Sequence, residues 1–170
     1  MDTAQTAAAS AATSSAEKIE RDGLIFALLY GQRYALRLGR FYSRIAGFLR
    51  FCEVVMGGTA FVAFFVKSPE AAAYSGLAVA IIGAINIAYD PAAKAKDAAI
   101  EEEKFGRAHV AVSDLANDQL RRSVRELQAT PRREIEALRM PVWRDVVLQI
   151  GRECPKEPIK PSEWMIGLMA

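Results

Sequence analysis

Cysteine and histidine are scarce in this chain, and their scarcity excludes several kinds of site. The 170 residues hold two cysteines and a single histidine, His109. Cys52 and Cys154 do not form the CxxC spacing of a zinc or redox motif, and no second histidine accompanies the first. We therefore expect no metal site, no cofactor and two free thiols in a reducing compartment.

Motifs of the common enzyme classes are also missing. The sequence contains no Gly-rich phosphate loop after a strand, no HExxH and no GxSxG. The run Glu101-Glu102-Glu103 points to different sides of a helix, so it is interpreted as a solvated face. A net charge of +2 is too small to indicate nucleic-acid binding. We predict no catalytic residue, and an enzyme is the least supported class.

Two further absences concern the N-terminus and strands. Residues 1–16 lack the basic and apolar regions of a secretory signal and consist mainly of Ala, Ser and Thr. Such a composition predicts a flexible tail, because it buries too little surface to offset the entropy of ordering. Since no segment shows strand alternation, the sequence predicts an all-α protein.

Hydrophobic residues, in contrast, are abundant and segregated from the charged ones. They make up 52% of the chain, although 25% of the residues are charged. Between residues 54 and 89 the only charges are Lys67 and Glu70. The turn KSPE therefore separates two apolar runs, residues 45–66 and 71–89. Each run has about the 20 residues that a helix needs to cross a bilayer.

A buried helical hairpin of a soluble bundle is the main alternative to a transmembrane hairpin at residues 45–89. Residues 71–89, however, lack the polar face of a soluble bundle helix. Basic residues flank both apolar runs, whereas the turn between them carries one lysine balanced by one glutamate. By the positive-inside rule, this pattern predicts a multi-pass membrane protein with both termini in the cytoplasm.

Small residues recur every fourth position in the second run, where they allow two helix backbones to approach closely in lipid. The first run has a matching patch. We predict a helix-packing or oligomer interface at these positions and at the polar residue beside them. The members are Gly57, Gly58, Gly76, Ala80, Ala84 and Asn86. Asn86 is interpreted as a helix-to-helix hydrogen-bonding group, with a pore-lining role as the alternative.

Residues 17–44 are predicted to form an amphipathic N-terminal helix, with arginines on one face that leads into the first apolar run. That face is either solvated or in contact with anionic lipid headgroups. Arg50 and Glu53 lie three residues apart and could pair, or Arg50 could extend to the headgroups. The predicted membrane-interface residues are Arg33, Arg37, Arg40, Arg44, Arg50 and Trp164.

Residues 90–153 are predicted to be cytoplasmic helices. The pairs Asp90-Pro91 and Thr130-Pro131 are typical helix starts, and Pro141 is expected to interrupt the last helix. Apolar residues at helical spacing predict a packing seam with the N-terminal helix or with a neighbouring copy. They are Phe105, Ala108, Val112, Leu115, Leu120, Val124 and Leu127. Residues 154–170 are predicted to be an extended Pro-rich tail with a short apolar end.

The segment YGQRYALRLGRFYSRIAGFLRF, the KSPE turn and the charged helix after the second run together resemble the SLATT family. The resemblance extends from about Tyr30 to Leu127 and concerns architecture and spacing. SLATT proteins are bacterial two-transmembrane proteins linked with nucleotide-dependent defence systems and thought to be pore-forming effectors. The resemblance therefore implies a membrane hairpin with cytoplasmic helices and a pore-forming or membrane-perturbing function, without a catalytic motif to transfer.

These observations lead to one main functional expectation and two alternatives. We expect an oligomeric inner-membrane effector whose cytoplasmic helices form an oligomerisation or sensing region, with the bilayer and further copies of the chain as partners. The first alternative is a non-catalytic anchor or accessory subunit of a larger membrane complex. The second is a holin-like phage protein with a similarly small hairpin.

Overall fold

The computed structural model describes residues 3–66, 68–130, 135–153, 161 and 170, and every regular element within these ranges is helical, as predicted. The elements are α1 (Thr3–Phe65), α2 (Pro69–Tyr89), α3 (Pro91–Val110), the 3-10 turn η1 (Ala111–Ser113), α4 (Asn117–Ala129) and α5 (Glu136–Gln149).

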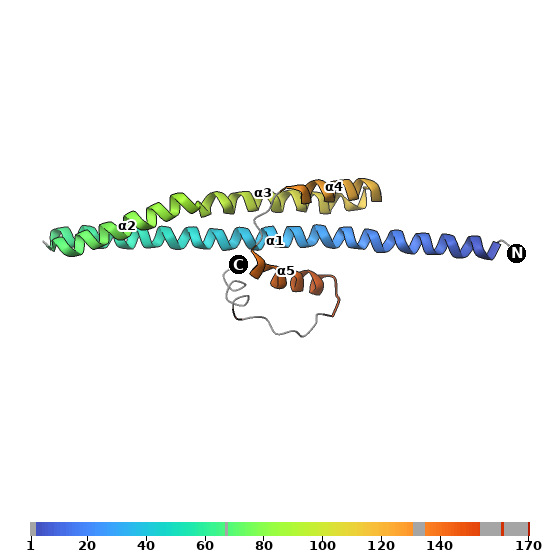
Figure 1. Cartoon of the computed structure of the whole chain (residues 1–170), viewed down its shortest axis with the longest axis horizontal. Coiled ribbons are helices and arrows are strands. Elements are labelled where there is room, and N and C mark those ends of the chain that lie inside the picture. The colour runs from blue at the N-terminus through green and yellow to red at the C-terminus, as the bar shows by residue number, and fades with distance from the viewer. Residues whose placement is uncertain (1–2, 67, 131–134, 154–160, 162–169) are drawn as a thin grey trace.

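Helix α1 is continuous over 63 residues and forms the axis of the molecule (Figure 1). At 1.5 Å per residue it is roughly 95 Å long. Residues 3–16, for which the sequence predicts a flexible tail, form the start of α1 in the structure. The predicted boundary between residues 44 and 45 is absent. Alanine has the highest helix propensity, so the Ala-rich start favours helix even though it offers little surface to bury.

Helices α2 and α3 run back along α1 in the opposite direction (Figure 1). They meet at Asp90, whose backbone is left-handed with φ of 40°. The Asp90 carboxylate accepts a hydrogen bond from the Ala93 amide at 3.1 Å, and Pro91 occupies the first turn of α3. The predicted helix start at Asp90-Pro91 is therefore confirmed, and it redirects the chain without ending its contact with α1.

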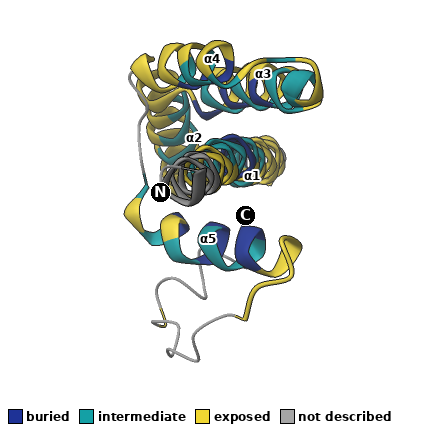
Figure 2. Ribbon diagram, turned by 90° about the vertical axis from the view of Figure 1, so that its right-hand side faces the viewer, coloured by how far each residue is buried: buried dark blue, intermediate teal, exposed yellow. Residues whose placement is uncertain are grey.

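Helices α3 and α4 lie on one side of α1, and α5 lies on the opposite side (Figure 2). The predicted start of the last helix at Thr130-Pro131 falls at the edge of a segment outside the described residues, so it stays a prediction. Thr130 follows the end of α4, residues 131–134 lie outside the described residues, and α5 begins at Glu136. Pro141 lies within the helical span of α5, so the interruption expected there is absent.

The predicted apolar seam packs against α1, which contains the N-terminal helix expected as one of its two possible partners. Phe105, Leu120 and Val124 are buried together with Leu28 of α1. The remaining predicted members surround this cluster: Ala108, Val112, Leu115 and Leu127. The seam thus joins α1, α3 and α4 into a three-helix bundle.

Arg21 of α1 fixes the connection between α3 and α4. Its guanidinium donates to the Val112 carbonyl at 2.7 Å, to the Asn117 side-chain oxygen at 2.8 Å and to the Leu115 carbonyl at 3.3 Å. The preceding residue, Glu20, accepts a hydrogen bond from Arg121 Nε at 2.7 Å. The same carboxylate raises the pKa of the Arg121 guanidinium, through hydrogen bonding and charge.

A second cluster joins α1 to α5. Leu138 and Val142 of α5 are fully buried against Tyr34, Leu38 and Tyr42 of α1. Ala98 of α3 and Ala170 complete the buried set. The Tyr34 hydroxyl accepts a hydrogen bond of 2.5 Å from the amide of Ile135, the residue directly before α5. Apolar contacts on one face of α5 thus hold it on α1.

Gly31 allows α1 and α3 to approach closely and leads to a first prediction. A Cβ added there would lie 2.5 Å from a ring atom of Phe105, which is buried. We expect Gly31→Ala to destabilise the fold by about 1–2 kcal/mol, because overpacking outweighs the gain in helix propensity. The measurement is thermal or denaturant unfolding of the purified chain followed by circular dichroism.

Gly47→Ala is the matched control, since a Cβ at Gly47 meets no atom within 4 Å. It should leave stability unchanged or raise it by up to about 1 kcal/mol. Equal effects of the two substitutions would contradict the packing of Phe105 on Gly31.

Candidate membrane-facing surface

Residues 47–65 of α1, Val66 and the whole of α2 form a two-helix arm that projects from the bundle (Figure 1). No buried residue occurs in α2, all of which the structure describes. Large apolar side chains are exposed along both helices of the arm. They are Phe48, Phe51, Val54, Val55, Phe61, Val62, Val66, Tyr74, Leu77, Ile81, Ile85, Ile87 and Tyr89. Helices of the bundle do not cover this apolar surface.

The length of the arm matches the thickness of a bilayer. Helix α2 has 21 residues, which corresponds to about 31 Å, and the hydrocarbon core of a bilayer is about 30 Å thick. Two helices in the described part of the chain are long and apolar enough to cross a membrane. The buried fraction of their most apolar windows is 6% and 0%, whereas a core helix of a soluble protein is mostly buried.

Polar side chains inside the arm face one another across the two helices. Asn86 Nδ2 donates to Glu53 Oε1 at 3.3 Å, which is the helix-to-helix interaction expected for Asn86. Nearer the turn, the hydroxyl oxygens of Thr59 and Ser75 lie 3.4 Å apart. Within the described residues Glu53 forms no ion pair with Arg50. These contacts pair α1 with α2, although the Thr59–Ser75 contact is exposed at the surface of the arm.

The predicted small-residue interface does not lie between α1 and α2. Gly76, Ala80 and Ala84 are exposed, and a Cβ added at Gly57, Gly58 or Gly76 meets no atom within 4 Å. The reason is geometric: positions four apart drift by about 40° per step around a helix. The stripe therefore leaves the face that contacts α1 and runs along the outer flank of α2, where another molecule can reach it.

The arginine row divides into two groups that have different surroundings in the structure. Arg37 forms an ion pair with Asp145 of α5 at 2.5 Å, and Arg33 Nε donates to Gln149 at 3.2 Å. Both side chains therefore have partners on α5, and their predicted role at the membrane interface stays a prediction. Arg40, Arg44 and Arg50, nearer the arm, remain exposed. Trp164 lies outside the described residues.

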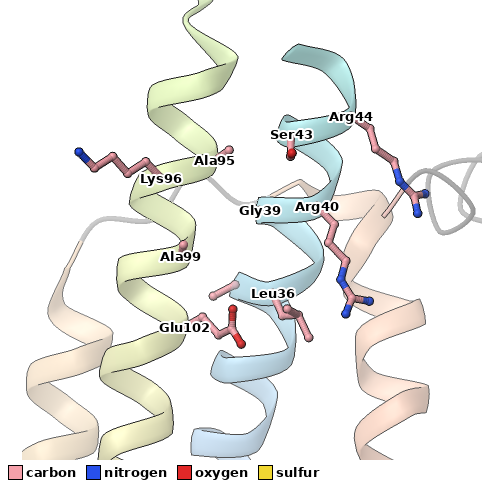
Figure 3. A pocket seen from close by; sticks show the side chains of 10 residues that line it. Leu36, Gly39, Arg40, Ser43, Arg44, Ala95, Lys96, Ala99 and Glu102 are labelled. Carbon is pink, nitrogen blue, oxygen red and sulfur yellow. The ribbon is translucent and has the colours of Figure 1, made fainter. Parts of the chain in front are cut away.

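A shallow groove of about 500 Å³ separates α1 from α3 just below the arm (Figure 3). Small residues line it, including Gly39, Ala95 and Ala99. Figure 3 shows Arg40 and Arg44 pointing away from α3, and Lys96 pointing in the opposite direction. The cations do not converge on one ligand, and they point to different sides of α1 and α3.

An aromatic and cationic cluster at the base of the arm is missing from the sequence prediction. The rings of Tyr42 and Tyr89 lie 6.1 Å apart between centroids. Lys94 Nζ lies 3.2 Å from the centroid of Tyr89 and 5.7 Å from that of Tyr42. Tyrosine and lysine are enriched where helices leave the hydrocarbon. The sequence feature that could have indicated this cluster is the position of Tyr89 and Lys94 at the end of the second apolar run.

The Arg37–Asp145 ion pair leads to a second prediction. Both side chains are partly exposed, at 22% and 39%, so we expect Arg37→Ala to weaken the docking of α5 by about 1 kcal/mol at low salt. The effect should shrink as ionic strength rises. Limited proteolysis between α4 and α5, at low and high salt, measures this docking.

Arg122→Ala is the control, because Arg122 is exposed on α4, away from α5. The charge exchange Arg37→Asp with Asp145→Arg should restore part of the protection that either single substitution loses. Equal cleavage of the wild type and Arg37→Ala would contradict a role of this pair in docking.

No family model, curated protein or solved structure matches this chain. The resemblance to the SLATT family therefore stays a prediction. Within the described residues, no group of three histidine, cysteine or acidic side chains could hold a metal ion. Cys52 is a free thiol, and Cys154 lies outside the described residues.

Proposed function

We propose that this chain is an integral membrane protein whose two-helix arm crosses a bacterial inner membrane, with the bundle and both termini in the cytoplasm. Copies of the arm associate in the bilayer and permeabilise or perturb it, as the resemblance to SLATT effectors implies. The helical bundle joins the copies outside the membrane and receives the signal that controls them.

The exposed apolar surface of α2 carries this proposal. In water, exposing residues such as Leu77, Ile81 and Ile85 along one uncovered helix would cost about 25 cal/mol for each Å² of apolar surface. Acyl chains remove that cost. The polar contact inside the arm also supports a lipid environment. Asn86 and Glu53 form a hydrogen bond between the two helices, and polar groups within hydrocarbon need such partners in the protein.

Charges at the two ends of the arm support the proposed orientation. Arg40 and Arg44 precede the arm, Arg50 lies in its first turn, and Lys94 and Lys96 follow the arm. The turn contributes one lysine and one glutamate, which cancel. An excess of basic residues marks the cytoplasmic end of a membrane helix, so the bundle belongs in the cytoplasm.

The outer flank of α2 supports association between copies. Gly76, Ala80 and Ala84 leave this flank thin and exposed. Small residues allow two helix backbones to pack closely within the hydrocarbon. We therefore expect the double substitution Gly76→Leu with Ala80→Leu to dissociate the oligomer. Native mass measurement of the chain in mild detergent tests this expectation.

Ala71→Leu is the matched control, because Ala71 is exposed but lies on another side of α2. It adds the same bulk and should leave the native mass unchanged. Persistence of the oligomer in the double variant would exclude this flank as the interface. Dye release from vesicles then tests perturbation, and intact vesicles with a stable oligomer would favour the accessory-subunit role instead.

A further inference from the structure

We propose that the groove beside Tyr42, Tyr89 and Lys94 binds the headgroup of a phospholipid that carries a primary ammonium, such as phosphatidylethanolamine. This inference rests on the proposed function, since it requires the arm to lie in a bilayer. It names a lipid class and a binding site on the side of the bundle where the arginine row does not lie.

The groove has the size and position for a headgroup. Its volume is about 480 Å³, and its lining extends from Ala88 at the end of the arm to Glu101 on α3. These positions are 13 residues apart, which corresponds to about 20 Å along the helices. The groove therefore begins where the acyl chains of a neighbouring lipid would end and continues into the headgroup region.

The charges along the groove follow the order of charges in a zwitterionic headgroup. Asp90, at the end of the arm, is occupied by the capping hydrogen bond of α3. Beyond it come Lys94, then Asp97 about one turn further, and Glu101 another turn beyond. In such a lipid the phosphate is attached near the acyl chains and the ammonium extends outward from it. Lys94 thus faces the expected position of the phosphate, and the carboxylates face that of the ammonium.

The aromatic pair holds the lysine in place for this role. Lys94 Nζ lies over the Tyr89 ring at 3.2 Å and near the Tyr42 ring at 5.7 Å. Tyr42 is only 4% exposed, so its ring position is fixed by packing. A cation held over aromatic rings loses less conformational freedom when a phosphate binds it.

The charge balance argues against an anionic lipid at this site. Besides Lys94, the groove is lined by Asp90, Asp97 and Glu101. Asp90 already accepts the capping hydrogen bond of α3, but Asp97 is exposed toward the surface. A carboxylate repels an anionic headgroup, whereas it accepts charge-assisted hydrogen bonds from a primary ammonium. A choline headgroup has no N–H to donate.

Native mass spectrometry of the full chain, titrated with lipids of identical acyl chains, tests the inference. We expect phosphatidylethanolamine to bind about tenfold more tightly than phosphatidylglycerol or phosphatidylcholine. Asp97→Asn should reduce this preference to about threefold or less, while Lys94→Gln should weaken the binding of all three lipids. Asp22→Asn, an exposed position far along α1, should preserve the preference.

Flotation with vesicles that contain only phosphatidylcholine and phosphatidylglycerol separates this inference from the proposed function. The wild type and Asp97→Asn should both insert, because insertion depends on the arm. Insertion without any preference for phosphatidylethanolamine would overturn the headgroup site alone. Failure of the wild type to insert would overturn both proposals.

Discussion

Ile81→Arg is expected to reduce membrane insertion of the chain by about a hundredfold or more. Ile81 lies near the middle of α2 and is 52% exposed. Arginine at the centre of a membrane helix costs about 3 kcal/mol relative to an apolar residue, and each 1.4 kcal/mol is about tenfold in an equilibrium constant. On a soluble protein the same exposed substitution would change stability by only about 0.5 kcal/mol.

Ile100→Arg is the matched control for this experiment. Ile100 is also partly exposed, at 43%, but it lies on α3 within the bundle. Alkaline extraction of membranes from expressing cells, followed by quantitation of both fractions, measures insertion. We expect Ile100→Arg to remain in the membrane and Ile81→Arg to be lost from it. Equal distribution of the two variants would show that α2 does not cross the bilayer.

Phe105→Ala is expected to destabilise the bundle by about 3–5 kcal/mol, which is the second large effect. The Phe105 ring is 2% exposed, and it packs against Leu28, Leu120 and Val124 at the junction of three helices. Gly31 faces the same ring, so no side chain there can move in to fill the cavity. The cost combines the lost transfer free energy with the cavity that remains.

Leu148→Ala is the control for Phe105→Ala, since Leu148 is 63% exposed on α5. Urea unfolding of the detergent-solubilised chain, followed by the helical signal, compares the two variants with the wild type. A shift of the midpoint in Phe105→Ala alone would agree with the bundle. Similar midpoints for both variants would contradict a core built on Phe105.

Much of the fold could be predicted because it depends on periodicity and capping. The apolar runs at residues 45–66 and 71–89, the start at Asp90-Pro91 and the seam through Phe105 all follow from local patterns. The continuity of α1 could not be inferred from the change in composition near residue 45. A helix can pass from a polar to an apolar environment without a break, because its backbone hydrogen bonds are internal.

The partners of individual side chains were harder to predict, because they depend on how distant helices pack. Asp145 lies 108 positions after Arg37, and α5 must fold onto α1 before they meet. The small residues of α2 can be recognised from their spacing, but only the packing of α2 on α1 shows that Gly76, Ala80 and Ala84 are exposed. Nor did the sequence indicate that Lys94 would lie over Tyr89, since this contact requires the turn at Asp90.

Site-directed spin labelling of α2 tests most directly whether acyl chains surround the arm. Nitroxides would be attached in turn at Tyr74, Leu77, Ile81 and Ile85, which are exposed in the structure, after replacement of Cys52 and Cys154 by serine. In reconstituted vesicles we predict frequent collisions with oxygen and few with a water-soluble nickel complex, most extreme at the centre of the helix. Frequent collisions with the nickel complex at all four positions would show that water surrounds the arm and would contradict the account.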